Sequence, residues 1–162
     1  MFLNYSMPKP ARFRATSSRD KVNVAPGIRA AIDPGTGTIA LAASNRVDLT
    51  FAGFKGVPQW IELAIALSDS EWRSCRSIFM KFQASATQIT VHPALRLGRG
   101  SGYHDFFSDE KQLVVEELSD YGNHFHLPPR WTEGSDWMDL HLFFTPREGH
   151  FTLHDLSLTG VR

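Results

Sequence analysis

The sequence lacks the features of disulfide-bonded, membrane-spanning and secreted proteins. Cys75 is the only cysteine among 162 residues, so no disulfide bond forms within the chain. No apolar run approaches the roughly 18 residues of a transmembrane helix. Residues 1–8 lack the apolar centre of a secretory signal. We therefore expect a soluble, cytoplasmic chain without a membrane partner.

Signatures of common enzymes and nucleotide sites are also missing. There is no Gly-x-x-x-x-Gly-Lys and no Gly-x-Ser-x-Gly. Residues 35–40 match the dinucleotide pattern Gly-x-Gly-x-x-Ala, but Pro34 precedes them and a strand-like segment follows where the motif needs a helix. Glu116 and Glu117 are adjacent, so on a strand they point to opposite faces and cannot form a glycosidase pair. We predict no catalytic residue and no cofactor, and favour binding over catalysis.

Charge of neither sign is in excess, but it is unevenly placed. The chain has 17 basic and 17 acidic side chains, whereas residues 1–30 hold six basic and one acidic. The remainder is net acidic, which disfavours a groove that tracks nucleic-acid phosphates. The prolines among residues 1–26 add to the irregular character of that segment. We predict a basic N-terminal tail or arm at 1–26 and one domain at 27–162.

Alternating apolar and polar residues dominate the rest of the chain. Phe, Trp and Tyr make up 12% of it, which suits strands and a large core. The spacing of Ser68 and Glu71 is that of a capping box and predicts one helical turn. The pattern predicts an all-β fold, a two-sheet antiparallel β-sandwich (jelly roll) with at most one or two short helical turns. The expected strands cover residues 47–51, 60–67, 78–83, 88–91, 95–97, 103–107, 112–118, 124–127, 137–144 and 151–158.

Turn signals suggest how some strands connect. Residues 145–149, Thr-Pro-Arg-Glu-Gly, predict a turn that joins the strands on either side as a hairpin. Asp33 and the residues up to Gly37 predict a turn within the first strand pair. The apolar parity switches at His154 and Asp155, which predicts a β-bulge.

The order of strands from about residue 60 to residue 160 resembles a galactose-binding-like jelly roll, the β-sandwich of many carbohydrate-binding modules. The closing segment 151–158, Phe-Thr-Leu-His-Asp-Leu-Ser-Leu, is similar to the final strand of such folds. The resemblance is architectural. It implies a binding domain, with carbohydrate the favoured ligand, although members of this fold also bind lipids or proteins. The structural calcium of many such modules is not carried over, since no run of acidic ligands is present.

Sugar binding requires flat aromatic faces for the apolar faces of the rings and polar groups for their hydroxyl edges. Trp72, Tyr103, Trp131 and Trp137 fall at strand ends or in loops, where a sandwich presents its binding loops. Arg96 borders a glycine-rich loop, and three histidines lie on the polar sides of strands. The predicted ligand-binding residues are Arg96, Tyr103, His124, His126, Trp131 and His141.

Two further hypotheses stay open at the level of sequence. Phe143 points outward on an otherwise polar strand face, which favours protein–protein interaction or a homodimer through an exposed sheet. If His124, His126 and His141 lay on neighbouring strands, their imidazoles would bind zinc or iron, as in a metal-dependent enzyme. No metal ligand is assigned on this basis.

Overall fold

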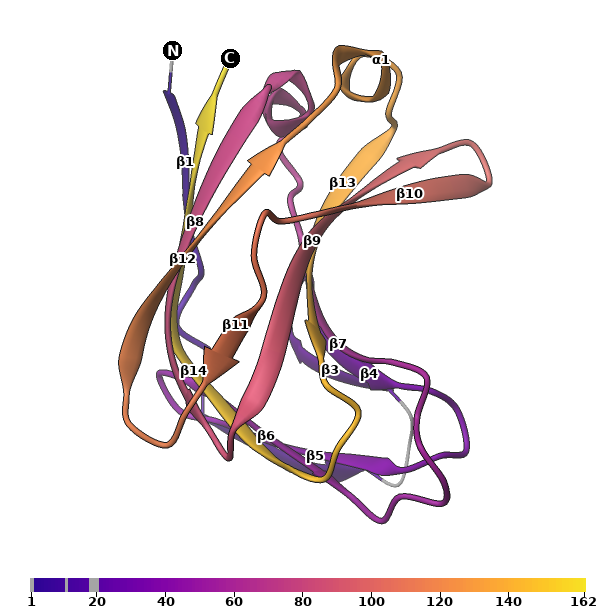
Figure 1. Ribbon diagram of the computed structural model, residues 1–162, viewed down its shortest axis with the longest axis vertical. Coiled ribbons are helices and arrows are strands. Elements are labelled where there is room, and N and C mark those ends of the chain that lie inside the picture. The colour runs from indigo at the N-terminus through magenta and orange to yellow at the C-terminus, as the bar shows by residue number, and fades with distance from the viewer. Residues whose placement is uncertain (1, 11, 18–20) are drawn as a thin grey trace.

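A computed structural model describes residues 2–10, 12–17 and 21–162. These residues form fourteen strands in two antiparallel sheets, which face each other as a sandwich (Figure 1). Only two single-turn helical segments occur in this part of the chain, η1 (Ser70–Ser74) and α1 (Pro129–Thr132). The predicted all-β two-sheet sandwich is confirmed. No helix among the described residues is long and apolar enough to cross a membrane.

Each sheet contains seven strands. The first, here called sheet A, runs in the order β12 (Ser119–His126), β8 (Ser77–Ala86), β14 (Gly149–Val161), β6 (Val47–Ala52), β5 (Thr38–Ala43) and β2 (Phe13–Ser17), with β1 (Phe2–Ser6) also paired to β14. The second, sheet B, runs β10 (Gly102–Phe107), β9 (Ile89–Arg99), β13 (Trp137–Phe144), β7 (Ile61–Ala66), β4 (Ile28–Ile32) and β3 (Lys21–Ala25), with β11 (Gln112–Val114) paired to β9.

The core lies between the two sheets because successive side chains on each strand alternate between its faces. The predicted strand at 60–67 is β7, whose Ile61, Leu63 and Ile65 are fully buried. Ring contacts join the sheets: the centroid of Phe144 in sheet B lies 4.8 Å from that of Phe151 in sheet A. One face of each sheet is therefore committed to the core, and the other is free to carry function.

The predicted hairpin around residues 145–149 is wrong. β13 pairs with β7 and β9 in sheet B, whereas β14 pairs with β6, β8 and β1 in sheet A. The turn after Asp33 likewise leads from β4 in sheet B to β5 in sheet A. Both turns therefore carry the chain from one sheet to the other, across the core. The sequence does not reveal this, because alternation shows which face of a strand is buried but not which strand lies beside it. The predicted bulge is confirmed, because the β14–β8 register shifts between Leu153 and Asp155.

The expected tail at residues 1–26 needs correction for the part that the structure describes. β1 pairs with the last five residues of β14, which brings the two chain ends together (Figure 1). β2 pairs with β5, and β3 pairs with β4. Val22 and Val24 of β3 are buried, so this short segment contributes to the core. Residues 1, 11 and 18–20 of the expected tail lie outside the described residues.

The predicted helical turn is confirmed as η1, with one difference. Its N-cap is Asp69 rather than Ser68, because the Asp69 carboxylate accepts a hydrogen bond of 2.8 Å from the backbone N–H of Glu71. Cys75, just after this turn, is fully buried. Its thiol has a raised pKa because burial disfavours the thiolate.

Candidate functional site

The outer face of sheet B gathers aromatic and charged side chains that the core does not use. Residue parity and strand register place them in rows across β10, β9, β13, β7 and β4. The polar residues on this face are Arg29, Glu62, His92, Arg96, Asp105, Asp139 and His141, and the aromatic ones are Tyr103, Phe107, Trp137 and Phe143. Small residues at Ala64, Ala66, Ala94 and Gly98 separate them. The face therefore combines low-lying backbone with projecting rings.

One row of this face forms an aromatic platform. Tyr103 of β10 and Trp137 of β13 both pair with Gly98 of β9, so the two rings flank a residue without a side chain. A Cβ atom at Gly98 would overlap the Cε2, Nε1 and Cζ2 atoms of the Trp137 indole, which shows that the indole lies against the Gly98 backbone. Trp137 stays 38% exposed and Tyr103 60% exposed. Both rings are accessible to a ligand.

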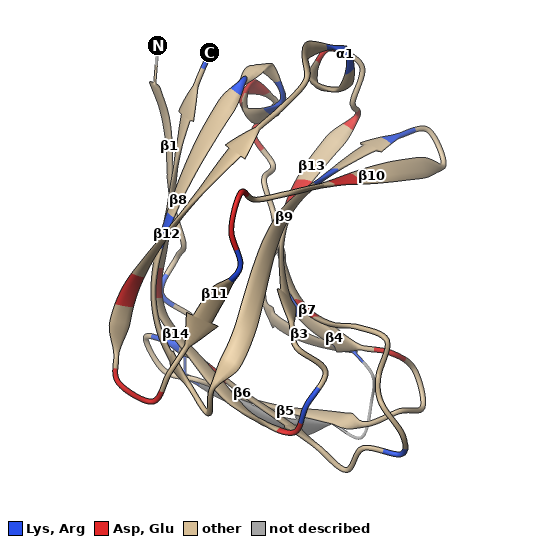
Figure 2. Ribbon diagram, in the orientation of Figure 1, with Lys and Arg blue, Asp and Glu red and all other residues tan. Residues whose placement is uncertain are grey.

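The next row supplies a fixed cation beside the platform. The Arg96 guanidinium donates two hydrogen bonds to the Asp105 carboxylate, at 2.6 and 2.8 Å. The same guanidinium lies 4.1 Å from the centroid of the Tyr103 ring. Hydrogen bonding to Asp105 raises the pKa of Arg96, so the group remains charged. Figure 2 shows acidic segments of β10 and β13 on either side of the basic position on β9.

Beneath this surface lies a buried histidine between two carboxylates. His141 has no exposed area, and its Nδ1 lies 2.8 Å from Oε2 of Glu62. Burial alone would raise the pKa of Glu62, but the hydrogen bond and charge of His141 and the charges of Arg96 and Arg29 lower it overall. Glu62 is therefore ionised and accepts a hydrogen bond, so Nδ1 of His141 carries a proton.

The second carboxylate behaves in the opposite way. Asp139 Oδ2 lies 4.0 Å from Nε2 of His141, and that nitrogen has no hydrogen-bond partner among the described residues. Burial raises the pKa of Asp139, and the charges of His141, Arg29 and Arg96 offset this only in part. Asp139 therefore keeps its proton to a higher pH than an exposed aspartate does.

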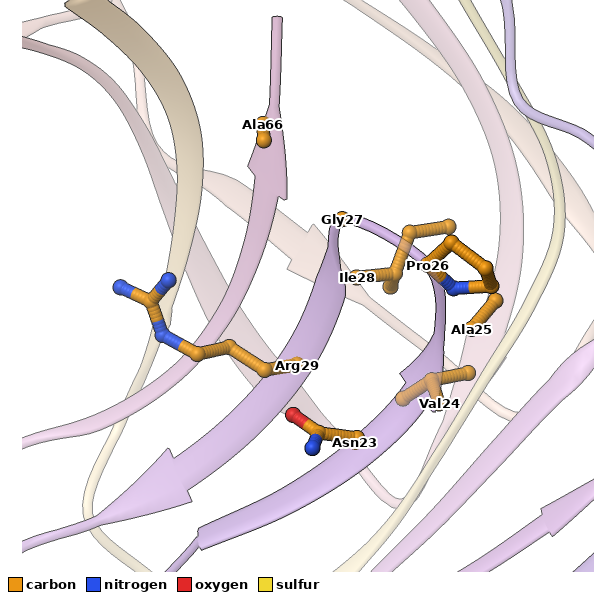
Figure 3. Close-up of a pocket in the computed structure, with 8 residues that line it drawn as sticks. All are labelled: Asn23, Val24, Ala25, Pro26, Gly27, Ile28, Arg29 and Ala66. Carbon is orange, nitrogen blue, oxygen red and sulfur yellow. The ribbon is translucent and has the colours of Figure 1, made fainter. Parts of the chain in front are cut away.

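Pockets lie at two ends of this face. The first, here the hairpin pocket, follows the β3–β4 connection, and Asn23 and Arg29 project from the same side of the two strands (Figure 3). The second, here the Trp60 pocket, lies where β9 and β13 approach the loop that precedes β7. Its lining includes Trp60, His92, Phe107, Lys111 and Phe143. The two pockets thus lie at opposite ends of β7, one near Ala66 and the other near Trp60.

The structure brings together three of the six predicted ligand-binding residues. Arg96, Tyr103 and His141 share the outer face of sheet B, although His141 lies buried beneath it. Trp131 lies on the other side of β10, where its ring stacks on His104 with a centroid distance of 4.9 Å and meets Phe106 edge-on. That ring packs against the core.

The hypothesis of a three-histidine metal centre is wrong. His124 and His126 belong to β12 in sheet A, and His124 stacks on Phe79 with a centroid distance of 4.5 Å. His141 belongs to sheet B, so the three imidazoles do not converge. Over the described ranges, no group of three or more His, Cys, Asp or Glu side chains is arranged to hold a metal ion.

Phe143 has a different environment from the one that suggested self-association. Its ring is half-buried on the outer face of sheet B, stacked on His141 at 5.6 Å and close to Phe107 at 5.8 Å between centroids. The side chain is thus part of the packed face. The homodimer remains a prediction, but the position of Phe143 no longer supports it.

Several residues of the face were missed or left unassigned by sequence reasoning. Glu62 is the one charged residue in an otherwise apolar strand. Because a buried charge is costly unless it is paired, such a position indicates a carboxylate with a specific partner. Asp139 gives no such signal, because it alternates with apolar residues as any exposed strand residue does, and Asp105 lies near a loop without a distinguishing context. The sequence places the aromatic Trp137 at a strand end, but the contact of its ring with Gly98 depends on a pairing that the sequence does not reveal.

No protein-family model matches this sequence, and no curated protein matches it. Solved structures share its fold at low identity. One described as "CBM4 structure and function" is 14% identical, with 82% of this chain and 87% of that chain covered and a TM-score of 0.56. The N-terminal cellulose-binding domain of Cellulomonas fimi β-1,4-glucanase C is 14% identical, with 91% and 99% covered and a TM-score of 0.54.

A third similar structure is an enzyme domain. The xyloglucanase domain of NopAA, a type three effector from Sinorhizobium fredii, was solved with cellobiose. It is 8% identical, with 92% of this chain and 99% of that chain covered and a TM-score of 0.51. The predicted architectural resemblance to carbohydrate-binding modules is therefore confirmed at the level of fold.

Proposed function

We propose that this protein binds carbohydrate on the outer face of sheet B and does not catalyse a reaction on it. The observation that carries the proposal is the platform of Trp137 and Tyr103 around Gly98, next to the Arg96–Asp105 pair. A sugar ring has an apolar C–H face and a polar hydroxyl edge. The platform offers exposed rings to the first, and the ion pair offers oriented polar atoms to the second.

The rigidity of these groups supports binding. Arg96 is held by two hydrogen bonds and by the Tyr103 ring, and Trp137 is seated on backbone, so little side-chain freedom is lost when a ligand arrives. The fold similarity to a cellulose-binding domain and to CBM4 agrees with such a role. His124 and His126, on sheet A, are not part of this site.

Glu62 and Asp139 have pKa shifts in opposite directions, which is the pattern of an acid and base pair in glycoside hydrolysis. However, the fully buried His141 ring contacts Glu62 and lies 4.0 Å from Asp139, and so occupies the space between the two carboxylates. A glycosidic bond has no place between them. These groups therefore serve to hold the binding face.

Native gels that contain a soluble polysaccharide test the proposal. The panel includes hydroxyethylcellulose, xylan, xyloglucan and a galactan, the last because the strand order resembles galactose-binding-like folds. At least one polymer retards the wild-type protein, and Tyr103→Ala abolishes the retardation. Phe79→Ala is the matched control, since Phe79 is an aromatic residue, 47% exposed, on sheet A. Equal retardation of wild type and Tyr103→Ala, or no retardation by any polymer, overturns the proposal.

A further inference from the structure

We infer that the ligand is a glycan chain of several linked rings that lies along β9 and β13, and that the Trp60 pocket is a second aromatic subsite for it. This inference rests on the proposed function and extends it from a single platform to a path. Three features of the outer face support it: a series of rings that Arg96 links to the platform, a pocket at the far end of that series, and the distance between the two ends.

Arg96 links the platform to a series of rings that leads to the pocket. Arg96, which lies over Tyr103, also lies 5.7 Å from the centroid of Phe143. Phe143 lies 5.8 Å from Phe107, and Phe107 lies 4.4 Å from His92, both between ring centroids. A ligand that leaves the Trp137 platform along the strands therefore meets Arg96 first and then the rings of Phe143, Phe107 and His92.

The Trp60 pocket is fixed in position by Asp33. The backbone N–H of Asp33 donates to the Trp60 carbonyl at 3.0 Å, and the Asp33 carboxylate accepts from the backbone N–H of Gln59 at 3.0 Å. The loop is thus tied to the end of β4. The pocket has a volume of about 430 Å³ and combines rings with polar groups that suit sugar hydroxyls: Gln59, Trp60, Thr90, His92, Phe107, Lys111 and Thr145 are among its lining residues.

The two subsites are too far apart for one sugar ring. Gly98 marks the platform and His92 marks the pocket. These two residues are six positions apart on β9, which corresponds to about 20 Å of extended strand. A single ring contacts one subsite only. A chain of several rings contacts both subsites. Once one part of the chain is bound at the first subsite, the rest of it is held at a high effective concentration near the second. Affinity should therefore rise with chain length until both subsites are filled.

Calorimetric titration with cello-oligosaccharides and xylo-oligosaccharides of two to six units tests this inference. The wild-type protein should bind the hexamer of one series at least about tenfold more tightly than the dimer. Trp60→Ala should remove this advantage, so that the hexamer binds with the affinity of the dimer, while the dimer affinity stays unchanged. Phe79→Ala should preserve both affinities. The contrast between dimer and hexamer separates a lost subsite from a damaged fold.

Phe107→Ala provides a second variant, because Phe107 is 49% exposed and lines the same pocket. It should also lower the hexamer affinity selectively. Equal affinities for dimer and hexamer, or full hexamer affinity in both variants, would overturn the second subsite and leave the proposed function intact. Absence of binding across both series would overturn the inference for these chains, and it would count against the proposed function only if no polymer of the panel retards the protein.

Discussion

The Trp137 indole lies against the backbone of Gly98, in the space that a β-carbon on that residue would fill. Gly98 belongs to β9 and Trp137 to β13, and the two residues are directly paired in the register of sheet B. The absence of a side chain on one strand thus allows a ring from its neighbour to lie low and flat. This arrangement makes the outer face a platform.

Gly98→Ala should displace the indole and lower carbohydrate affinity by about tenfold or more, the usual cost of losing a central aromatic contact. The fold should persist, since Gly98 does not have a positive φ angle. Calorimetry gives the affinity, and quenching of tryptophan fluorescence by acrylamide reports the new exposure of the ring.

The double variant with Trp137→Ala distinguishes this explanation from a general effect on β9. If Gly98 acts only through the indole, Gly98→Ala should cause no further loss of affinity once the indole is gone. Additive losses would show that Gly98 contributes in another way.

Asp105→Asn should lower the free energy of unfolding by about 1–3 kcal/mol, because it replaces charge-assisted hydrogen bonds to Arg96 with weaker neutral ones. Both side chains are largely shielded from solvent, so screening does not remove the effect. Urea denaturation measures the change. Asp120→Asn on sheet A is the control, since its carboxylate lies on an exposed strand position and makes one long hydrogen bond of 3.3 Å to Gln83.

Glu62→Gln should destabilise the protein most at neutral pH. The folded-state pKa of Glu62 is lowered from its ordinary 4.5, so its stabilising contribution is present above that value and is lost as the pH falls through the folded pKa. We expect a loss of about 1–3 kcal/mol at pH 7. The difference between wild type and variant should shrink below about pH 4.5. A difference independent of pH from 3 to 7 would argue against an ionised Glu62 bound to His141.

Asp139→Asn should have the reverse dependence. The folded-state pKa of Asp139 is raised from its ordinary 3.8, so ionisation of this residue costs stability increasingly as the pH rises above 3.8, and in full above the raised value. The variant should be more stable than wild type at pH 7, because the asparagine has no charge to bury. The gain should disappear as the pH falls below 3.8. Thermal unfolding across this range measures it, and a variant less stable at pH 7 would contradict the assignment.

Much of the fold was predictable because side-chain alternation reports burial directly. Ile61, Leu63 and Ile65 identified β7 and its inner face, and the parity switch near Asp155 identified the bulge. Strand partners were less predictable. Residues 145–149 have the composition of a hairpin turn, yet β13 and β14 belong to different sheets. Each strand buries one apolar face, and these faces meet in the core between the sheets.

The site was predictable only in part for the same reason. Arg96 and Tyr103 were identified from residue type, and the structure places them in contact. His124 and His126 have the same alternating pattern as His141, but that pattern does not distinguish sheet A from sheet B. Trp131 and Trp137 both fall near strand ends. Only the pairing of Trp137 with Gly98 makes one of them a platform while the other packs against the core.

Chemical-shift mapping of an isotopically labelled sample, during titration with the hexasaccharide that binds best, tests directly whether the outer face of sheet B binds the glycan. The indole N–H of Trp137 and the amides of Gly98 and Tyr103 should shift first and most, with smaller shifts towards His92. The amides of Phe79 and His124, on the outer face of sheet A, should not move. Large shifts confined to sheet A, with an unchanged Trp137 signal, would contradict binding on sheet B.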